Sequence, residues 1–237
     1  MKISWNRRYA LLTAALWVTV LCPAGAKESD SKWYWLSEDQ QTELLASVPP
    51  KPAPGSAQDK ADLQGDLKLQ ATRTAQDIAE AKFDRHFRIE MISNVLGAGF
   101  TKENDPATFT LLKRVLQDEY LLDSKAKKEN QRNRPYVDHS EIKNLFEASD
   151  FSYPSGHSCG SYTLAAILSQ LFPPQTAALE ARADAVAHSR LVAGVHYPSD
   201  VAEGKILANA LVTDLLANAA FQADLAAAKA ELAQKNR

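Results

Sequence analysis

Three short polar stretches interrupt an otherwise apolar, helical pattern, and their residue types suit the binding of an anion. The first contains Lys127 and Arg134, seven residues apart. On a continuous helix this spacing would place both cations on nearly one face, two turns apart, where they repel unless an anion lies between them. A solvated basic helix end, favoured by the helix dipole, explains this stretch equally well when it is taken alone.

The second stretch is Ser155-Gly156-His157, directly before an apolar segment at 162–171. Glycine allows the backbone to approach a ligand closely, and the start of a helix offers free N–H groups to an anion. The serine adds a hydroxyl donor, and the histidine can hold or give a proton near neutral pH. A turn with a capping serine would explain the serine and the glycine, but not the histidine.

The third stretch contains Arg190, His196 and Asp200, with Pro198 suited to the first turn of a helix. Asp200 would then lie in that first turn and accept a hydrogen bond from one ring nitrogen of His196. The other ring nitrogen would be free to act as a nucleophile or a base. The Arg190 guanidinium is a bidentate donor that matches phosphate. A buried, hydrogen-bonded histidine is the alternative for this stretch alone, but three stretches together favour an anion site.

The elements that must position these residues are predicted to be helices. Ser56 can cap a helix that begins at Ala57, Thr74 with Asp77 marks another start, and Pro106 suits the first turn of a long amphipathic helix. The sequence has neither the alternating apolar pattern of paired strands nor any internal repeat. We therefore predict an all-α, single-domain helical bundle. Further helical patterns cover residues 159–171, 176–192, 201–216 and 221–235.

The first 26 residues have the pattern of a secretory signal peptide. Lys2, Arg7 and Arg8 precede an uncharged segment that ends in Pro23-Ala24-Gly25-Ala26, so cleavage is expected after Ala26. The apolar part is shorter than the roughly 20 residues of a membrane helix. We expect a signal peptide at 1–26, an extended arm at 27–55 around its proline-rich end, and a helical catalytic domain at 56–237. The expected location is periplasmic or secreted, without membrane association after cleavage.

Composition excludes several classes of protein. The 237 residues are 45% hydrophobic and 24% charged, with a net charge of −2. Without the three basic residues of the signal peptide, 24 basic and 29 acidic residues give −5. This chain is neither disordered nor basic enough to bind nucleic acid by its overall charge. Cys159 is the one cysteine of the mature chain, which therefore has no internal disulfide.

Taken in order, Lys-x6-Arg-Pro, Pro-Ser-Gly-His and Ser-Arg-x5-His-x3-Asp resemble the signature of the type 2 phosphatidic acid phosphatase superfamily. The exported helical chain is similar to the class A bacterial nonspecific acid phosphatases in that superfamily. The proline-rich arm, the Arg73-Thr74 stretch and the tail at 221–234 are similar too. The resemblance implies the helical fold shared by acid phosphatases and vanadium haloperoxidases, and a hydrolase of small-molecule phosphate monoesters that vanadate inhibits.

Roles for individual residues follow from this resemblance. His196 would attack phosphorus to give a phosphohistidine, Asp200 would orient it, and His157 would protonate the leaving alcohol. The phosphate oxygens would be bound by Lys127, Arg134, Ser155, Gly156 and Arg190. These cations imply a reaction without a metal or another cofactor, since they can stabilise the charge of a phosphoryl group in transfer.

The sequence leaves several points open. The family places an acidic residue upstream of the lysine, and Gln117, Asp118 and Glu119 compete for that place. The choice of Lys127 over Lys128 depends on the six-residue gap alone. The preferred ester, the pH optimum, the balance of hydrolysis and phosphotransfer, and a homodimer or higher homo-oligomer are not determined. A vanadate-dependent haloperoxidase and a phosphate-binding protein without activity are the alternatives, which halide oxidation and p-nitrophenyl phosphate assays would separate.

Overall fold

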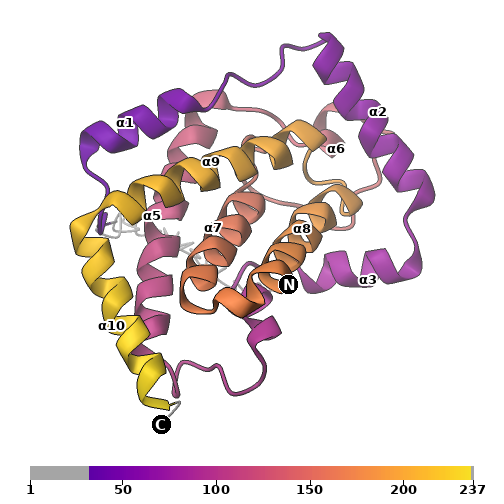
Figure 1. The fold of residues 1–237 in the computed structure, drawn as a ribbon. Coiled ribbons are helices and arrows are strands. Elements are labelled where there is room, and N and C mark those ends of the chain that lie inside the picture. The colour runs from indigo at the N-terminus through magenta and orange to yellow at the C-terminus, as the bar shows by residue number, and fades with distance from the viewer. Residues whose placement is uncertain (1–31, 236–237) are drawn as a thin grey trace, which may run out of the picture. The chain divides into compact units, whose positions relative to one another are not determined.

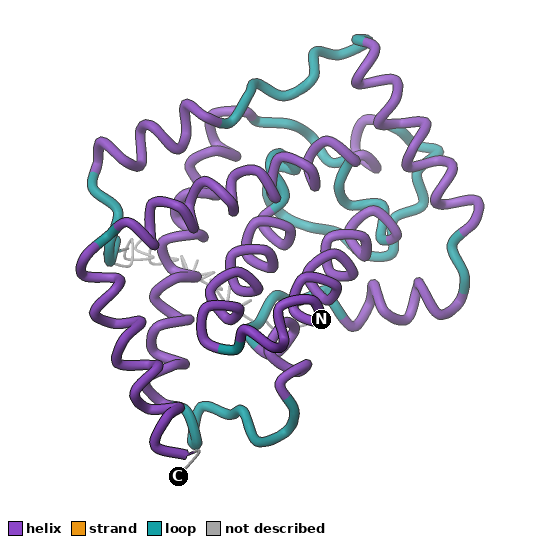
Figure 2. The backbone as a smooth tube through the Cα atoms, viewed as in Figure 1, coloured by secondary structure: helices purple, strands orange, loops and turns teal. Residues whose placement is uncertain are grey.

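The computed structural model describes residues 32–235, and these form helices joined by loops, with no strand among them (Figures 1 and 2). The all-α prediction is therefore confirmed. The predicted signal peptide, with Cys22, lies outside the described residues. The helices are α1 (Glu38–Ser47), α2 (Ala57–Thr72), α3 (Ala75–Phe83), α4 (Glu90–Ser93), η1 (Asn94–Leu96), α5 (Pro106–Asn130), α6 (Pro135–Asp138), α7 (Gly156–Leu171), η2 (Pro173–Gln175), α8 (Thr176–Val192), α9 (Pro198–Ala217) and α10 (Ala219–Lys235).

Helix α7 is the centre of the bundle, packed against α5, α8 and α9 (Figure 1). Its sequence is apolar around most of the helix, as expected for a helix covered on all sides. Leu164, Ile167 and Leu168 are completely buried in the core that it shares with its neighbours. Because α7 begins at Gly156, this packing also fixes the position of the Ser155-Gly156-His157 stretch.

The helix starts agree with the capping pattern of the sequence. Ser56 accepts a hydrogen bond from the Asp59 N–H, and Thr74 forms a capping box with Asp77. Pro106 and Pro198 occupy the first turns of α5 and α9, where a missing N–H removes no intrahelical hydrogen bond.

The structure corrects two predictions about local conformation. The extended arm predicted for 27–55 contains helix α1, because Ser37 and Gln40 form a capping box and Leu44 is buried against the core. The helix that carries Lys127 ends at Asn130, since Gln131 adopts a left-handed conformation with φ of 47°. Arg134 therefore does not share a helix face with Lys127 and reaches the same region from the loop before α6.

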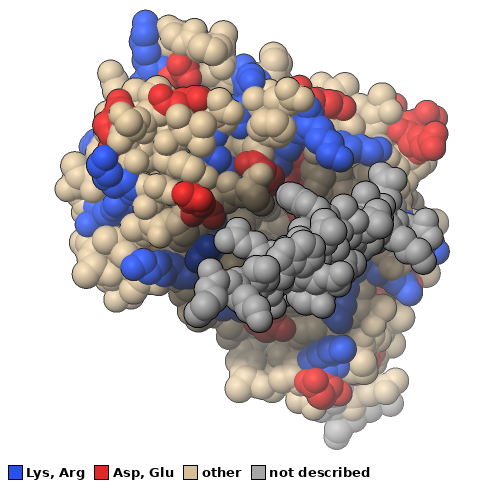
Figure 3. Space-filling model, turned by 180° about the vertical axis from the view of Figure 1, so that it is seen from behind, with Lys and Arg blue, Asp and Glu red and all other residues tan. Residues whose placement is uncertain are grey.

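No single helix within residues 32–235 is long and apolar enough to cross a membrane. Helices α9 and α10 meet those criteria only as a pair, which is bent by 87°. On the face of the molecule that Figure 3 shows, basic and acidic side chains are interspersed among the residues drawn in colour.

Gly204 sets the distance between α7 and α9. A Cβ atom at this position would lie 2.5 Å from the Ser155 carbonyl oxygen and 2.8 Å from the Ser158 Cβ. Real Cβ atoms do not approach backbone this closely, so any larger residue would separate the two helices. Because His157 lies in the first turn of α7 and α9 follows His196, the separation would also alter the distance between the two histidines.

We predict that Gly204→Ala lowers the free energy of unfolding by about 1–3 kcal/mol, the usual result of overpacking a core. Activity should fall together with stability, and urea denaturation monitored by circular dichroism would measure the first effect. Gly99→Ala is the matched control, since a Cβ there meets nothing within 4 Å. Equal stability of the two variants would contradict this account of the helix contact.

Candidate active site

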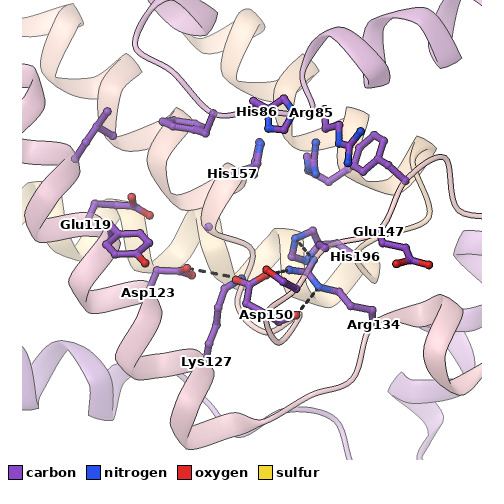
Figure 4. A pocket seen from close by; sticks show the side chains of 18 residues that line it. Arg85, His86, Glu119, Asp123, Lys127, Arg134, Glu147, Asp150, His157 and His196 are labelled. Carbon is purple, nitrogen blue, oxygen red and sulfur yellow. Dashed lines mark hydrogen bonds and ion pairs between the residues drawn. The ribbon is translucent and has the colours of Figure 1, made fainter. Parts of the chain in front are cut away.

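Most of the residues singled out in the sequence line one cavity of about 650 Å³. Side chains from α5, the α7 start, α8 and four loops surround it (Figure 4). The two sequence-predicted residues that do not line it are Ser155 and Asp200. The six that do are Lys127, Arg134, Gly156, His157, Arg190 and His196.

His196 is buried with its two ring nitrogens in different environments. Its Nε2 lies 2.7 Å from an Arg134 guanidinium nitrogen, and its Nδ1 lies 3.4 Å from Asp200 Oδ2. Because arginine only donates hydrogen bonds, Nε2 must be the unprotonated nitrogen, and Nδ1 carries the proton that faces Asp200. Burial, followed by the charges of Arg134 and Lys127, lowers the pKa of His196 well below its usual value. The ring is therefore neutral, and the Nε2 lone pair accepts the hydrogen bond from Arg134 beside the cavity.

Asp200 is held behind His196 by a buried network. Its Oδ1 accepts a hydrogen bond from Arg132 at 2.7 Å, and its Oδ2 accepts one from the Tyr197 N–H at 2.8 Å. Arg132 also pairs with Asp62 of α2 at 2.8 Å. Sequence reasoning missed both residues: Arg132 lies within the first stretch but received no role, and Asp62 lies outside the three stretches.

Lys127 and Arg134 converge on a third residue that sequence reasoning also missed. The Asp150 carboxylate accepts hydrogen bonds from Lys127 Nζ at 2.7 Å and from the Arg134 guanidinium at 2.5 Å. The two cations are 5% exposed, whereas the Asp150 side chain is 57% exposed. Partial desolvation acts to raise the pKa of Asp150, but the two cations lower it overall, so a carboxylate occupies the place between them. Lys128 is exposed and Lys127 is buried, which agrees with the choice made from the spacing.

Arg190 is the third cation at the cavity. One of its terminal nitrogens donates to the Asp84 carbonyl at 3.0 Å, and its guanidinium lies over the Phe146 ring. Burial and the neighbouring Arg134 lower its pKa to about 9, and its Nε has no partner among the described residues. A buried guanidinium with an unused donor is suited to an anionic ligand.

In the view of Figure 4, His157 lies at the upper side of the cavity. Its ring forms a hydrogen bond with the Arg85 backbone, while its Nε2 is buried without a partner among the described residues. Burial, followed by the charges of Arg190, Lys127 and Arg134, lowers its pKa well below the usual value. This nitrogen can therefore accept a proton, or donate one once a bound anion has raised the pKa.

Ser155 caps α7 and is completely buried, and its Oγ accepts from the Ser158 N–H at 3.4 Å. Its role in binding phosphate stays a prediction. Gly156 lies against Asp123, since a Cβ there would be 2.7 Å from Asp123 Oδ2. The glycine is thus required where the start of α7 approaches α5.

The structure distinguishes among the three candidates for the acidic residue upstream of Lys127. Of the three candidates, only Glu119 lines the cavity. Asp118 points the other way and accepts hydrogen bonds from the Tyr34 and Trp35 N–H groups. Asp123 also lines the cavity, one turn after Glu119, and the i, i+4, i+8 spacing to Lys127 could have revealed it.

Comparison with known proteins gives a consistent result. Residues 115–222 match the model of the PAP2 superfamily. The chain is 32% identical to a non-specific acid phosphatase from Salmonella typhi, over 80% of each chain. Its fold is similar to a transmembrane PAP2-type phosphatidylglycerolphosphate phosphatase from Bacillus subtilis (20% identity, TM-score 0.53, 73% of this chain and 89% of that one). A bacterial vanadium-dependent iodoperoxidase is also similar in fold (18% identity, TM-score 0.55, 72% of this chain and 54% of that one).

The buried carboxyl group of Asp66, which lies near Asp200 and Asp62, makes the stability of the protein depend on pH. Burial, followed by the charges of Asp200 and Asp62, raises its pKa to about 8, and both its carboxyl oxygens lack partners among the described residues. The folded protein therefore keeps a proton that the unfolded chain loses near pH 4. The contribution of Asp66 to stability is therefore highest below that pH and falls until about pH 8, by about 1.4 kcal/mol per pH unit.

We predict that Asp66→Asn, which mimics the protonated acid, removes this loss. Relative to wild type, the variant should gain stability between pH 4 and pH 8, with an upper bound of about 4 kcal/mol near pH 7. Urea denaturation at several pH values would measure the difference in the free energy of unfolding. A difference that does not change with pH would show that Asp66 is not protonated in the folded state.

Proposed function

Because this chain belongs to the PAP2 superfamily and is an acid phosphatase, we propose that it hydrolyses a broad range of phosphate monoesters through a phosphohistidine on His196. The observation that carries the proposal is the orientation of His196. Its unprotonated Nε2 faces a cavity lined by three buried cations, and its Nδ1 faces Asp200.

Substrate binding begins with an exchange of anions. In the free protein the Asp150 carboxylate lies between Lys127 and Arg134. A phosphate dianion carries more charge and more acceptor oxygens than a carboxylate, so it can displace Asp150. Asp150 lies on a loop, and its exchange leaves the helices that hold His196 and His157 unchanged. Arg190 and the N–H groups at the start of α7 would bind the remaining oxygens.

In the first step Arg134 would turn from His196 Nε2 to the phosphate, and the released lone pair forms the Nε2–P bond as the bond from phosphorus to the ester oxygen breaks. Lys127, Arg134 and Arg190 stabilise the charge that spreads over the three equatorial oxygens. Asp200 accepts the Nδ1–H bond and stabilises the positive charge that develops on the ring. These cations supply the charge that a divalent ion would otherwise provide, so the proposal requires no metal.

His157 would give its proton to the departing alkoxide and later take one from water. Its pKa is low without a ligand, and a bound phosphate would raise it by placing negative charge nearby. Because that proton must be supplied from solution, turnover should increase as the pH falls below neutral. In the second step water attacks phosphorus, its proton returns to His157, and the Nε2–P bond breaks.

Export to the periplasm or beyond is the second part of the proposal. It is supported by the basic start, the uncharged segment and the small residues before Lys27. A phosphatase that acts on many esters would be separated in this way from the phosphorylated metabolites of the cell interior.

We predict that an alkaline quench after mixing with labelled p-nitrophenyl phosphate traps an acid-labile, alkali-stable label on the wild-type protein. His196→Ala should carry no label, because it lacks the attacking nitrogen. His157→Asn should accumulate the label, because the second step lacks its base while p-nitrophenolate leaves without a proton. Label that persists in His196→Ala would refute the assignment of the nucleophile.

The anion exchange gives a separate prediction. Asp150→Asn should bind inorganic phosphate about tenfold more tightly, a change of about 1.4 kcal/mol, because an amide competes less well for two cations. Isothermal titration calorimetry would measure this affinity. Glu147→Gln removes one charge from the same loop and serves as the control. Weaker binding in Asp150→Asn would instead mean that Asp150 positions Lys127 and Arg134 for phosphate.

A further inference from the structure

The wall of the cavity that α5 forms carries two acids beside Lys127. Glu119, Asp123 and Lys127 follow one another at intervals of four residues and so lie in one row along the helix. In the view of Figure 4, Glu119 and Asp123 lie on one side of His157, and His196 and Arg134 lie on the other. The α5 wall of the cavity thus changes along the helix from the cation Lys127 to the two acids.

These two carboxyl groups are buried without enough donors. Glu119 is 5% exposed and Asp123 is 6% exposed, and Glu119 Oε1 and Asp123 Oδ1 have no hydrogen-bond partner among the described residues. The cation beside Asp123 is Lys127 at 3.7 Å, and that lysine is bonded more closely to Asp150. Buried polar atoms nearly always have a partner, so two free oxygens at a cavity point to a ligand with donor groups.

The raised pKa values of Glu119 and Asp123 are those expected of two acids without enough neighbouring positive charge. Burial, followed by the charge of Asp123, raises the pKa of Glu119 well above its usual range. Burial raises the pKa of Asp123 to about 6, although Lys127 acts in the opposite direction. A positively charged group placed beside the pair would allow both to ionise and would be attracted in return.

The acidic wall lies where the alcohol part of a substrate would leave the phosphate. Phe87 packs edge-on against the His157 ring, with a centroid distance of 5.4 Å, and lines the cavity together with Leu116 and Tyr120. Since His157 is the proposed acid for the ester oxygen, the carbon attached to that oxygen would meet these residues. Asp123 is close to the phosphate site through Lys127, so a donor on a short alcohol can reach it.

We propose that Glu119 and Asp123 form a subsite that favours phosphate monoesters of amino alcohols. The inference rests on the proposed function and specifies which alcohols the site favours as leaving groups. An ammonium group offers three donors and the missing positive charge, whereas a hydroxyl offers one donor and no charge. An alcohol that carries a second anionic group would be repelled by the same carboxylates. The subsite therefore ranks short esters by the charge of the alcohol.

The experiment compares three esters of similar size: O-phosphoethanolamine with a cationic alcohol, propyl phosphate with a neutral one, and phosphoglycolate with an anionic one. p-Nitrophenyl phosphate serves as the activity reference. In the wild-type protein, kcat/KM should decrease in the order cationic, neutral, anionic. Glu119→Gln and Asp123→Asn should each lower the ratio of the cationic to the neutral ester about tenfold, which corresponds to about 1.4 kcal/mol. Glu147→Gln, an exposed acid on the opposite side of the same cavity, should leave that ratio unchanged.

Each outcome bears on one of the two proposals. A structural role for the acids, such as holding Lys127, would lower kcat/KM equally for all three esters and would overturn the subsite. A wild-type protein without preference for the cationic ester would overturn it as well, even if both variants failed to fold. Failure to hydrolyse any ester, p-nitrophenyl phosphate included, would instead refute the proposed function. The ratio is measured within one preparation, so partial loss of folded protein cancels.

Discussion

The burial of several positive charges in one small region is the constraint on which the rest of the structure depends. Lys127, Arg132, Arg134 and Arg190 are all 5% exposed or less. Removing a cation from water is unfavourable by several kcal/mol unless partners replace the lost hydration. These partners come from distant parts of the chain, so the surrounding helices must dock before the charges are compensated.

The compensation is of two kinds, and the difference determines what the site can do. Arg132 is paired with two buried acids, Asp62 and Asp200, which are completely inaccessible to solvent and cannot be exchanged. Lys127 and Arg134 share Asp150, which is more than half exposed and lies on a loop. The first arrangement fixes the His196 imidazole in one orientation. In the proposed mechanism, the second keeps Lys127 and Arg134 in place while leaving their anion replaceable, so that these donors are preorganised before substrate arrives.

Much of the fold could be predicted because its signals are local. The caps at Ser56 and Thr74 and the prolines at 106 and 198 mark helix starts within one turn. Six of the eight predicted site residues share one cavity because the three stretches lie at helix ends, and α7 gathers those ends around its own N-terminus. The α1 helix was missed because its apolar face is short and becomes buried only after it packs against α5 and α9.

The partners of the site could not be predicted, because they depend on tertiary contacts. Arg132 and Asp62 are seventy residues apart, and nothing near either residue indicates the other. The end of α5 at Gln131, which brings Arg134 to Lys127 from a loop, requires a left-handed residue that carries no glycine signal.

The acids of α5 show the same limit within one helix. Asp118 and Glu119 are neighbours in the sequence, yet one anchors the Tyr34 and Trp35 backbone and the other faces the cavity. The rotation of α5 decides between them, and packing against α7 and α10 sets that rotation. The row that includes Lys127 must then also bring Glu119 and Asp123 to the cavity. A single helix rotation therefore fixes both the cation proposed to bind phosphate and the acids proposed to face the alcohol.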